Sequence, residues 1–132
     1  MNKRLKLLLL ILWMVFIFIM SSFDGIESSN QSNFIVNIIA NIFNIKNIEL
    51  LSIIIRKLAH FTEYFILGIL AYNYLIEYNQ KIYLTVIICI IYAITDELHQ
   101  IITPDRVFSI YDILIDSSGA IIGAYLFKKI KK

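Results

Sequence analysis

Four apolar segments, each close to the length of a membrane-crossing helix, divide the chain, and short polar stretches separate them. They cover about residues 5–23, 57–78, 81–101 and 107–127. A helix needs roughly 20 mostly apolar residues to cross the hydrocarbon core of a bilayer. The pattern therefore predicts an all-α membrane protein, a four-helix transmembrane bundle that forms a single domain over residues 1–132.

The first apolar segment also has features of a signal peptide. Lys3, Arg4 and Lys6 precede it, and the small residues Ser21 and Ser22 follow it. A basic start, an apolar run and a small-residue cleavage site together define such a peptide. Because the run approaches spanning length and lacks a good Ala-x-Ala site, we expect it to be retained as the first span.

The stretch between the first two spans predicts a polar loop followed by an amphipathic helix. Residues 21–33 are polar, and the loop is expected there. Over residues 34–47, isoleucines at positions 35, 38, 39 and 42 fall on one face and asparagines at 33, 37, 41 and 44 on the other. This spacing is typical of a helix lying along the membrane interface. An ordered surface loop is the alternative.

Composition supports a membrane protein and excludes other classes. The chain has 132 residues, of which 59% are hydrophobic and 17% charged, with a mean hydropathy of +0.76. A soluble domain of this size could not bury so much apolar surface. The net charge of +2 gives no reason to expect nucleic acid as a partner. The single cysteine, Cys89, excludes a disulfide framework and a metal site built on paired thiolates.

The distribution of charge predicts how the spans are oriented. Eight of the 12 lysines and arginines lie before the first span, at Lys81 between the second and third spans, or after the fourth. Because positive charge is retained in the cytoplasm, we expect a multi-pass plasma-membrane protein with both termini cytoplasmic. Nine of the ten acidic residues then lie outside or in the outer half of a span, Glu77 being the exception.

The second span carries ionisable residues on one helical face. Arg56, His60, Glu63 and Tyr64 recur at intervals of three and four residues. A carboxylate at membrane depth needs a cation, a proton or water, and such groups indicate a functional site by default. We therefore take His60 and Glu63 as candidate catalytic residues; a helix-stabilising pair is the structural alternative.

At the end of the third span, Asp96, His99 and Gln100 are predicted to share a face, with Glu97 pointing elsewhere. A carboxylate beside a histidine suits general acid–base catalysis, with Asp96 orienting His99 as the base. A divalent metal at His60, Glu63, Asp96 and His99 is a further possibility. The usual zinc-ligand spacings are missing, so we predict no metal and no other cofactor.

The turn and the fourth span add residues suited to binding an anion. Arg106 follows Pro104 in the turn, and arginine binds phosphate or carboxylate in a bidentate manner; a salt bridge to Asp105 or Asp112 is the alternative. Asp112, Asp116, Gly119 and Gly123 form one stripe, whose glycines would let another helix approach closely and aim both aspartates into the bundle. The candidate substrate-binding residues are Lys57, Glu97, Gln100, Arg106, Asp112 and Asp116.

In combination and in this order, these motifs resemble those of the VanZ-like family of integral membrane proteins. The matching positions cover nearly the whole chain: Ser21-Ser22…Asp24-Gly25, Lys57-x-x-His60-Phe61-x-Glu63-Tyr64-x-x-Leu67-Gly68, and Asp96-Glu97-x-His99-Gln100…Pro104-x-Arg106…Asp112-x-x-x-Asp116-x-x-Gly119. Asp105 and Asp116 stand where relatives often have Gly and Asn. The resemblance implies four spans and an association with resistance to teicoplanin, a glycopeptide antibiotic with an acyl tail; it implies no reaction.

Three classes of function fit these features. The first is a cell-envelope protein whose outer polar site binds or modifies a membrane lipid or a lipid-linked cell-wall precursor. The second is a non-enzymatic binding or assembly protein in which the polar cluster is structural. The third, a proton-coupled transporter, would need a polar path to the cytoplasm, where the sequence offers only Glu77. The sequence does not predict the oligomeric state.

Overall fold

The computed structural model describes residues 2–23, 25–104 and 106–131, leaving aside the side chains of residues 25–31. It contains five α-helices and a short 3-10 helix, and the described residues form no strand. The helices are α1 (Lys3–Ser21), α2 (Gly25–Phe43), α3 (Ile48–Leu75), α4 (Ile82–Gln100) and α5 (Ile110–Ile130), with η1 (Ile76–Tyr78) after α3. The predicted all-α fold is confirmed.

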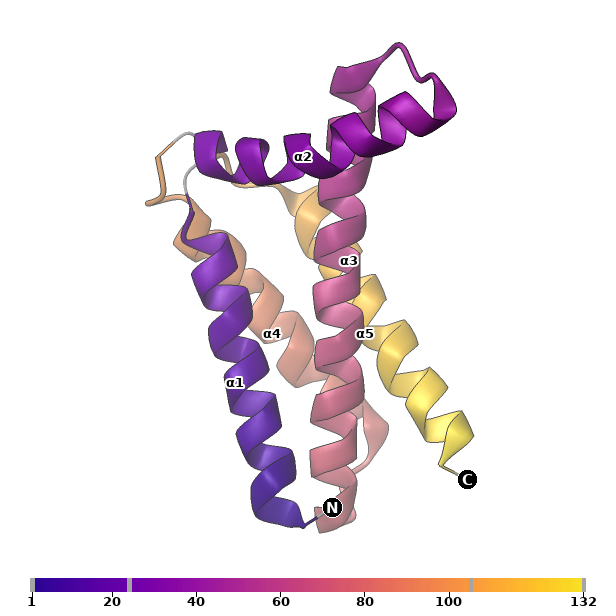
Figure 1. Ribbon diagram of the computed structural model, residues 1–132. Helices are drawn as coiled ribbons and strands as arrows, with labels where there is room; N and C mark the ends of the chain where they lie inside the picture. The colour runs from indigo at the N-terminus through magenta and orange to yellow at the C-terminus, as the bar shows by residue number, and fades with distance from the viewer. Residues whose placement is uncertain (1, 24, 105, 132) are drawn as a thin grey trace.

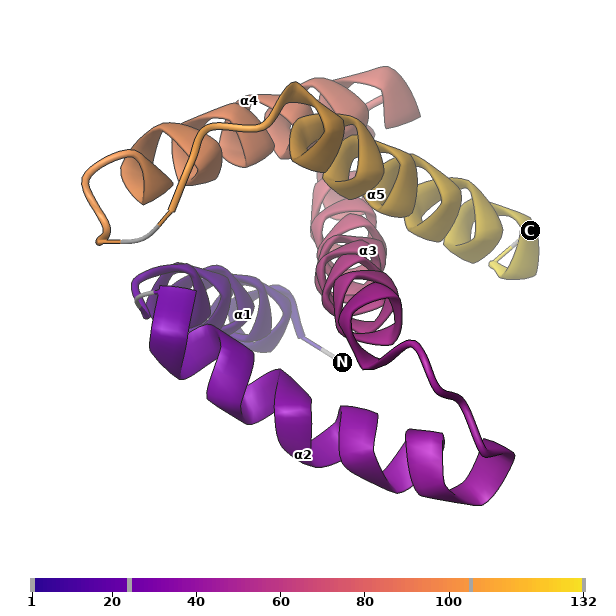
Figure 2. The ribbon, with the colours of Figure 1, turned by 90° about the horizontal axis from the view of Figure 1, so that it is seen from above.

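Helix α3 is the centre of the bundle and contacts each of the other four α-helices. Viewed along its axis, α3 is surrounded by α1, α4 and α5, and α2 lies across one end (Figure 2). The core joins α1, α3, α4 and α5 through a cluster of buried side chains that includes Ile17, Tyr64 and Leu67. Two hydrogen bonds fasten α1: Trp13 Nε1 donates to the Glu63 carbonyl (2.9 Å), and Tyr92 Oη donates to the Met14 carbonyl (2.7 Å).

Three helices, α1, α4 and α5, are long and apolar enough to cross a membrane. Helix α3 is the longest at 28 residues but carries more polar side chains. The order of the helices nevertheless requires α3 to cross the same thickness, because α1 ends beside α2 and α4 starts at the opposite end of the bundle (Figure 1). This geometry supports the prediction that α3 contains the second of the four spans.

Helix α2 corrects the prediction for the segment between the first two spans. The helix begins at Gly25 and ends at Phe43, so most of the predicted polar loop at residues 21–33 is helical. Val36 and Ala40 pack against Leu51 of α3, while Phe34, Ile38 and Ile42 are exposed. An exposed apolar face on a helix lying across the ends of spans fits the predicted interfacial position.

Both chain termini and the 79–81 connection lie at one end of the bundle, which we call the terminal end (Figure 1). Lys3 Nζ donates to the Glu77 carbonyl (3.1 Å), and the Glu77 carboxylate forms ion pairs with Lys6 and Lys131. The tight connection turns at Asn79, which has φ 55°, a left-handed conformation that asparagine tolerates better than most residues. The predicted placement of both termini and the hairpin on one side is confirmed.

The Glu77 network predicts a small, pH-dependent contribution to stability. The hydrogen bond from Lys6 lowers the pKa of Glu77, so the contribution is complete above the carboxyl's unfolded-state pKa and is lost as the pH falls through the folded-state value. We expect Glu77→Gln to lower the melting temperature slightly at pH 7 and to match wild type at low pH. Melting curves over a pH series, with Glu49→Gln as the control, check this. An equal deficit at every pH would contradict it.

Candidate functional site

The end of the bundle opposite the termini, which we call the polar end, gathers most of the predicted site residues. Helix α3 begins there, α4 ends there, and residues 101–109 connect α4 to α5. Helix α2 lies over this end (Figure 1). Ionisable side chains from three helices and one connection therefore meet beneath a single covering helix.

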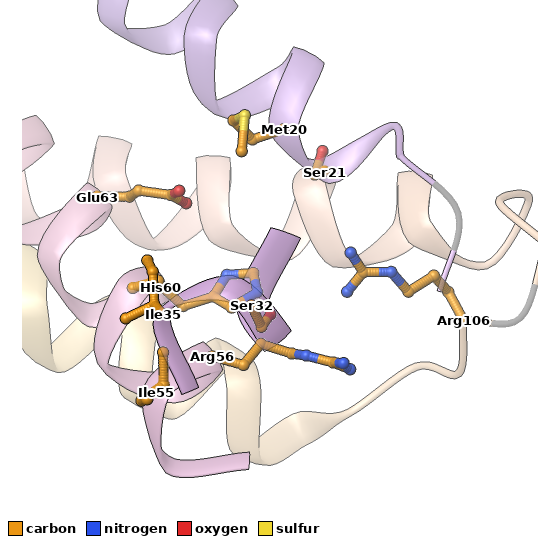
Figure 3. Close-up of a pocket in the computed structure, with 10 residues that line it drawn as sticks. Met20, Ser21, Ser32, Ile35, Ile55, Arg56, His60, Glu63 and Arg106 are labelled. Carbon is orange, nitrogen blue, oxygen red and sulfur yellow. The ribbon is translucent and has the colours of Figure 1, made fainter. Parts of the chain in front are cut away.

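A cavity of about 160 Å³ lies directly beneath α2. Arg56, His60 and Glu63 line it from α3, as their shared helical face predicted, and Arg106 enters from the connection. Ser32 and Ile35 of α2 form its cover. Figure 3 shows the Arg56 and Arg106 side chains reaching into the space between α3 and the connection, with His60 and Glu63 deeper along α3.

A second cavity of about 320 Å³ adjoins the first and shares Arg56, His60 and Arg106 with it. Lys57, Gln100 and Asp112 also line this cavity. Lys57 Nζ forms an ion pair with Asp112 Oδ1, which ties the start of α5 to α3. Four of the six predicted substrate-binding residues, Lys57, Gln100, Arg106 and Asp112, thus line this cavity.

Asp116 is brought against α3 by close helix packing. A methyl carbon added at Gly119 would lie 2.4 Å from the Phe61 carbonyl oxygen, so only glycine permits this approach. Asp116 is 1% exposed, and its Oδ1 lies 3.8 Å from His60 Nδ1. The prediction that the glycine stripe admits a neighbouring helix and aims Asp116 inward is confirmed.

The last turn of α4 divides its polar residues between two directions. Asp96 and Gln100 are buried in the bundle, and Gln100 Nε2 donates to Asp96 Oδ2 (3.5 Å). His99 instead faces α1, where its ring lies 4.5 Å from that of Phe18 and its Nε2 lies 3.1 Å from Ser22 Oγ. The expected orientation of His99 by Asp96 is therefore not the pairing that the structure displays, because Phe18 and Ser22 hold the His99 ring against α1.

Glu97 has a structural partner. Its side chain is 1% exposed and accepts a hydrogen bond from the backbone N–H of Ser109 (2.6 Å). Ser109 is the N-cap of α5, and its Oγ accepts from the Asp112 N–H (3.3 Å). Glu97 thus fixes the end of α4 to the start of α5, in a direction different from that of Asp96, as predicted.

Several polar atoms at the polar end are buried without a hydrogen-bond partner among the described residues. They are His60 Nδ1, Asp116 Oδ1 and the Nε atom of Arg106. Buried polar groups are nearly always satisfied, so a group of exceptions in one place indicates a functional site or bound water.

Carboxylates dominate the electrostatics of this buried group. The main charged neighbours of Asp116 are Asp96, Asp112, Glu63 and Glu97, all of them acidic. Arg106, in the connection, has a pKa lowered first by burial and then by repulsion from Arg56. Two guanidinium groups and several carboxylates are thus held close together, and the desolvation penalty of burying such groups can exceed the attraction between them.

Sequence reasoning left two residues at the polar end out of the predicted site. Arg56 and Tyr64 share the helical face of His60 and Glu63 but were not included as site residues; Arg56 lines both cavities, and Tyr64 is completely buried next to Asp96. Their spacing from His60, four residues on each side, was the available signal. Asp24 and Asp105 of the matching motifs lie outside the described residues.

The side chains proposed as metal ligands do not form a ligand set. Within the described residues, no three His, Cys, Asp or Glu side chains are arranged to hold a metal ion. His99 faces α1, whereas His60, Glu63 and Asp96 lie on the inner side of α3 and α4. The geometry therefore gives no support to a metal at His60, Glu63, Asp96 and His99.

Comparison with known proteins assigns the chain to a family. The family model for VanZ/LLP1 matches residues 6–131. The chain belongs to the VanZ/LLP1 family. No curated protein and no solved structure matches it. The VanZ/LLP1 match spans all five helices, so the resemblance inferred from the motifs is confirmed over the whole bundle.

Proposed function

We propose that this VanZ/LLP1 protein works at the outer leaflet of the plasma membrane, where its polar end binds or modifies a membrane lipid or a lipid-linked cell-wall precursor. The consequence would be altered susceptibility to acylated glycopeptide antibiotics such as teicoplanin. One observation carries the proposal: Arg56, His60 and Arg106 line two adjoining cavities beneath the interfacial helix α2. An amphiphile at the membrane surface would present its head group at this level.

The distribution of basic residues supports an outward-facing polar end. Eight of the 12 lysines and arginines belong to the terminal end, and four lie near the polar end. Excess positive charge in short loops stays in the cytoplasm. Both termini would then be cytoplasmic, and the cavities would open toward the outside of the cell.

In an enzymatic form of the proposal, His60 rather than His99 is the favoured base. His60 lies in both cavities and 3.8 Å from Asp116, a spacing from which a small movement would make a hydrogen bond. General bases need to reach the substrate first and to have a suitable pKa second. Glu63 in the same cavity would be the acid, and Arg106 would hold an anionic group.

The alternative is a binding or assembly protein in which the polar groups hold the helices together. The Lys57–Asp112 ion pair and the Glu97–Ser109 hydrogen bond favour this for those residues. They do not favour it for His60 and Asp116, each of which has a buried polar atom without a hydrogen-bond partner among the described residues. The Lys57–Asp112 and Glu97–Ser109 contacts therefore fit an assembly protein, whereas His60 and Asp116 fit a binding or catalytic site.

Teicoplanin susceptibility tests the proposal, with vancomycin as the control antibiotic. A sensitive Gram-positive host would express wild type, His60→Ala, Asp96→Asn or His99→Ala at matched membrane levels. We expect wild type to raise the inhibitory concentration of teicoplanin selectively. His60→Ala should remove this protection while the protein still accumulates, because general acid–base groups typically contribute about 10²- to 10⁴-fold to a rate. Asp96→Asn, which replaces a buried carboxylate at the polar end, should also remove it. His99→Ala should retain most of it.

Other outcomes have distinct meanings. Reduced accumulation of His60→Ala and Asp96→Asn would favour the assembly function. Loss of protection in His99→Ala alone would restore His99 as the base. If wild type gave no protection against teicoplanin, the antibiotic role would be rejected for this chain.

A further inference from the structure

A hollow of about 570 Å³ lies on the surface of α5 near its C-terminus, at the terminal end of the bundle (Figure 1). The residues that line it are Ile121, Ile122, Tyr125, Leu126, Lys128 and Lys129. At 3.6 residues per turn, these positions share one face of the helix. Ala120 and Gly123, which contact α3, lie on the opposite face. The hollow therefore faces away from α3, toward the lipid when α5 crosses a membrane.

The chemistry of the hollow changes in one direction along the helix axis. Ile121 and Ile122 line the part nearest the middle of the bundle, Tyr125 follows, and the two lysines line the part nearest the C-terminus. At 1.5 Å per residue, this sequence of groups covers roughly 12 Å. Tyrosine is enriched where the hydrocarbon meets the head groups of a membrane. The order apolar, aromatic and cationic is therefore the order that a phospholipid presents from its acyl chains to its phosphate.

The two lysines of the hollow have no counter-charge within the part of the chain that the structure describes. Eight of the 12 lysines and arginines belong to the terminal end, where the sequence offers Glu77 as the acidic residue. The Glu77 carboxylate is already paired with Lys6 and Lys131. Among the described residues, Lys128 and Lys129 take part in no ion pair. Their ammonium groups therefore suit an anion supplied from outside the chain.

A lipid fits this surface better than a soluble anion does. Lysines in the last turn of a helix also complement its dipole, but that role requires no apolar hollow beside them. A lysine stem can lie along an apolar surface while its ammonium group stays at the level of the head groups. Basic residues next to a span attract anionic lipids. The C-terminal part of α5 leans out from the bundle, so the bilayer can reach this face (Figure 1, Figure 2).

We propose that the hollow on α5 is a binding site for one anionic phospholipid. Lys128 and Lys129 hold its phosphate, and its acyl chains lie against Ile121, Ile122 and Leu126. The bound lipid fixes the depth at which the C-terminal part of α5 sits in the membrane. This site lies at the opposite end of the bundle from the cavities of the proposed function and does not depend on them.

Native mass spectrometry of the full-length protein in a non-ionic detergent would count the bound lipids. The protein would be titrated with dioleoylphosphatidylglycerol and, separately, with dioleoylphosphatidylcholine, which has the same chains but no net charge. We expect the first phosphatidylglycerol to bind about 20-fold more tightly than phosphatidylcholine, because each lysine near an anionic lipid contributes about fivefold. Phosphatidylglycerol should also raise the melting temperature, as does any ligand that binds only the folded protein.

Paired substitutions separate this site from the general charge of the terminal end. The double variant Lys128→Gln/Lys129→Gln should lose the roughly 20-fold preference for phosphatidylglycerol and bind phosphatidylcholine as wild type does. Lys128→Arg/Lys129→Arg keeps both charges and should keep the preference. The matched control is Arg4→Gln/Lys81→Gln, which removes two exposed cations from the same end but from other helices or connections, and it should behave as wild type.

Three results would overturn the lipid site. The first is equal binding of phosphatidylglycerol and phosphatidylcholine to wild type. The second is an equal loss of preference in the control variant, which would show that the total charge of the terminal end attracts the lipid. The third is a preference lost in sodium phosphate but kept in sodium chloride of the same ionic strength, which would assign the lysines to a soluble phosphate. Teicoplanin protection enters none of these results, so this inference and the proposed function can fail separately.

Discussion

Gly123→Ala is expected to prevent most of the protein from reaching its folded, membrane-inserted state. A methyl carbon at this position would lie 2.0 Å from the Phe65 carbonyl oxygen, and one at Gly68 would lie 2.1 Å from the Ala120 carbonyl oxygen. These neighbours are backbone atoms, so no side chain can rotate away and α3 and α5 would have to separate. In a membrane, packing between small residues is the main source of helix association.

Helix propensity would predict the opposite effect. Alanine favours a helix by about 1 kcal/mol relative to glycine. Overpacking costs typically about 1–3 kcal/mol and more where backbones collide, so the clash outweighs the propensity gain. We expect a melting temperature lowered by about 10 °C or more, or no folded protein, using a shift of roughly 4–8 °C per kcal/mol for a small domain.

Size-exclusion chromatography of detergent-solubilised protein after a heating series would measure this. Ile122→Phe is the matched control, because it adds more volume one residue away on an exposed face and should leave stability unchanged. A melting temperature for Gly123→Ala equal to or above that of wild type would show that α3 and α5 are not packed as closely as described.

The helices could be predicted from the sequence because hydropathy alone determines which segments can enter a bilayer. The third and fourth predicted spans lie within three residues of α4 and α5, and the second, at 57–78, lies within α3 and η1, although α3 begins earlier, at Ile48. The start of α2 at Gly25 was missed. Ser and Asn have low helix propensity and favour turns, so the local pattern of residues 25–33 gave no helical signal.

The sequence predicts which side chains share a helical face at the polar end, but not which of them contact each other. Spacing of three or four residues identifies which side chains share a face on one helix, and it correctly grouped Arg56, His60 and Glu63. It does not give the rotation of one helix relative to another. The sequence predicted that Asp96 pairs with the nearby His99. In the structure, Asp96 lies beside Gln100, and His60 lies beside Asp116 of α5.

Asp116→Asn is expected to stabilise the fold of the protein. Asp116 is 1% exposed, has one carboxylate oxygen without a hydrogen-bond partner among the described residues, and has acidic main neighbours. A buried charge among like charges is costly, and an amide of the same shape removes that cost. We expect a melting temperature higher by several degrees, equivalent to about 1–2 kcal/mol.

Asp112→Asn is the matched comparison, one helical turn away on the same helix. Its carboxylate is paired with Lys57, so neutralising it should lower the melting temperature rather than raise it. The same heating series would measure the melting temperatures of both variants. A lower value for Asp112→Asn and a higher one for Asp116→Asn would show that Asp112 stabilises the contact between α5 and α3, whereas Asp116 destabilises the fold. A lower melting temperature in both variants would make Asp116 a structural residue and favour the assembly function. Natural proteins commonly retain destabilising residues where function needs them, and that trade-off is what distinguishes an active site from a scaffold in this bundle.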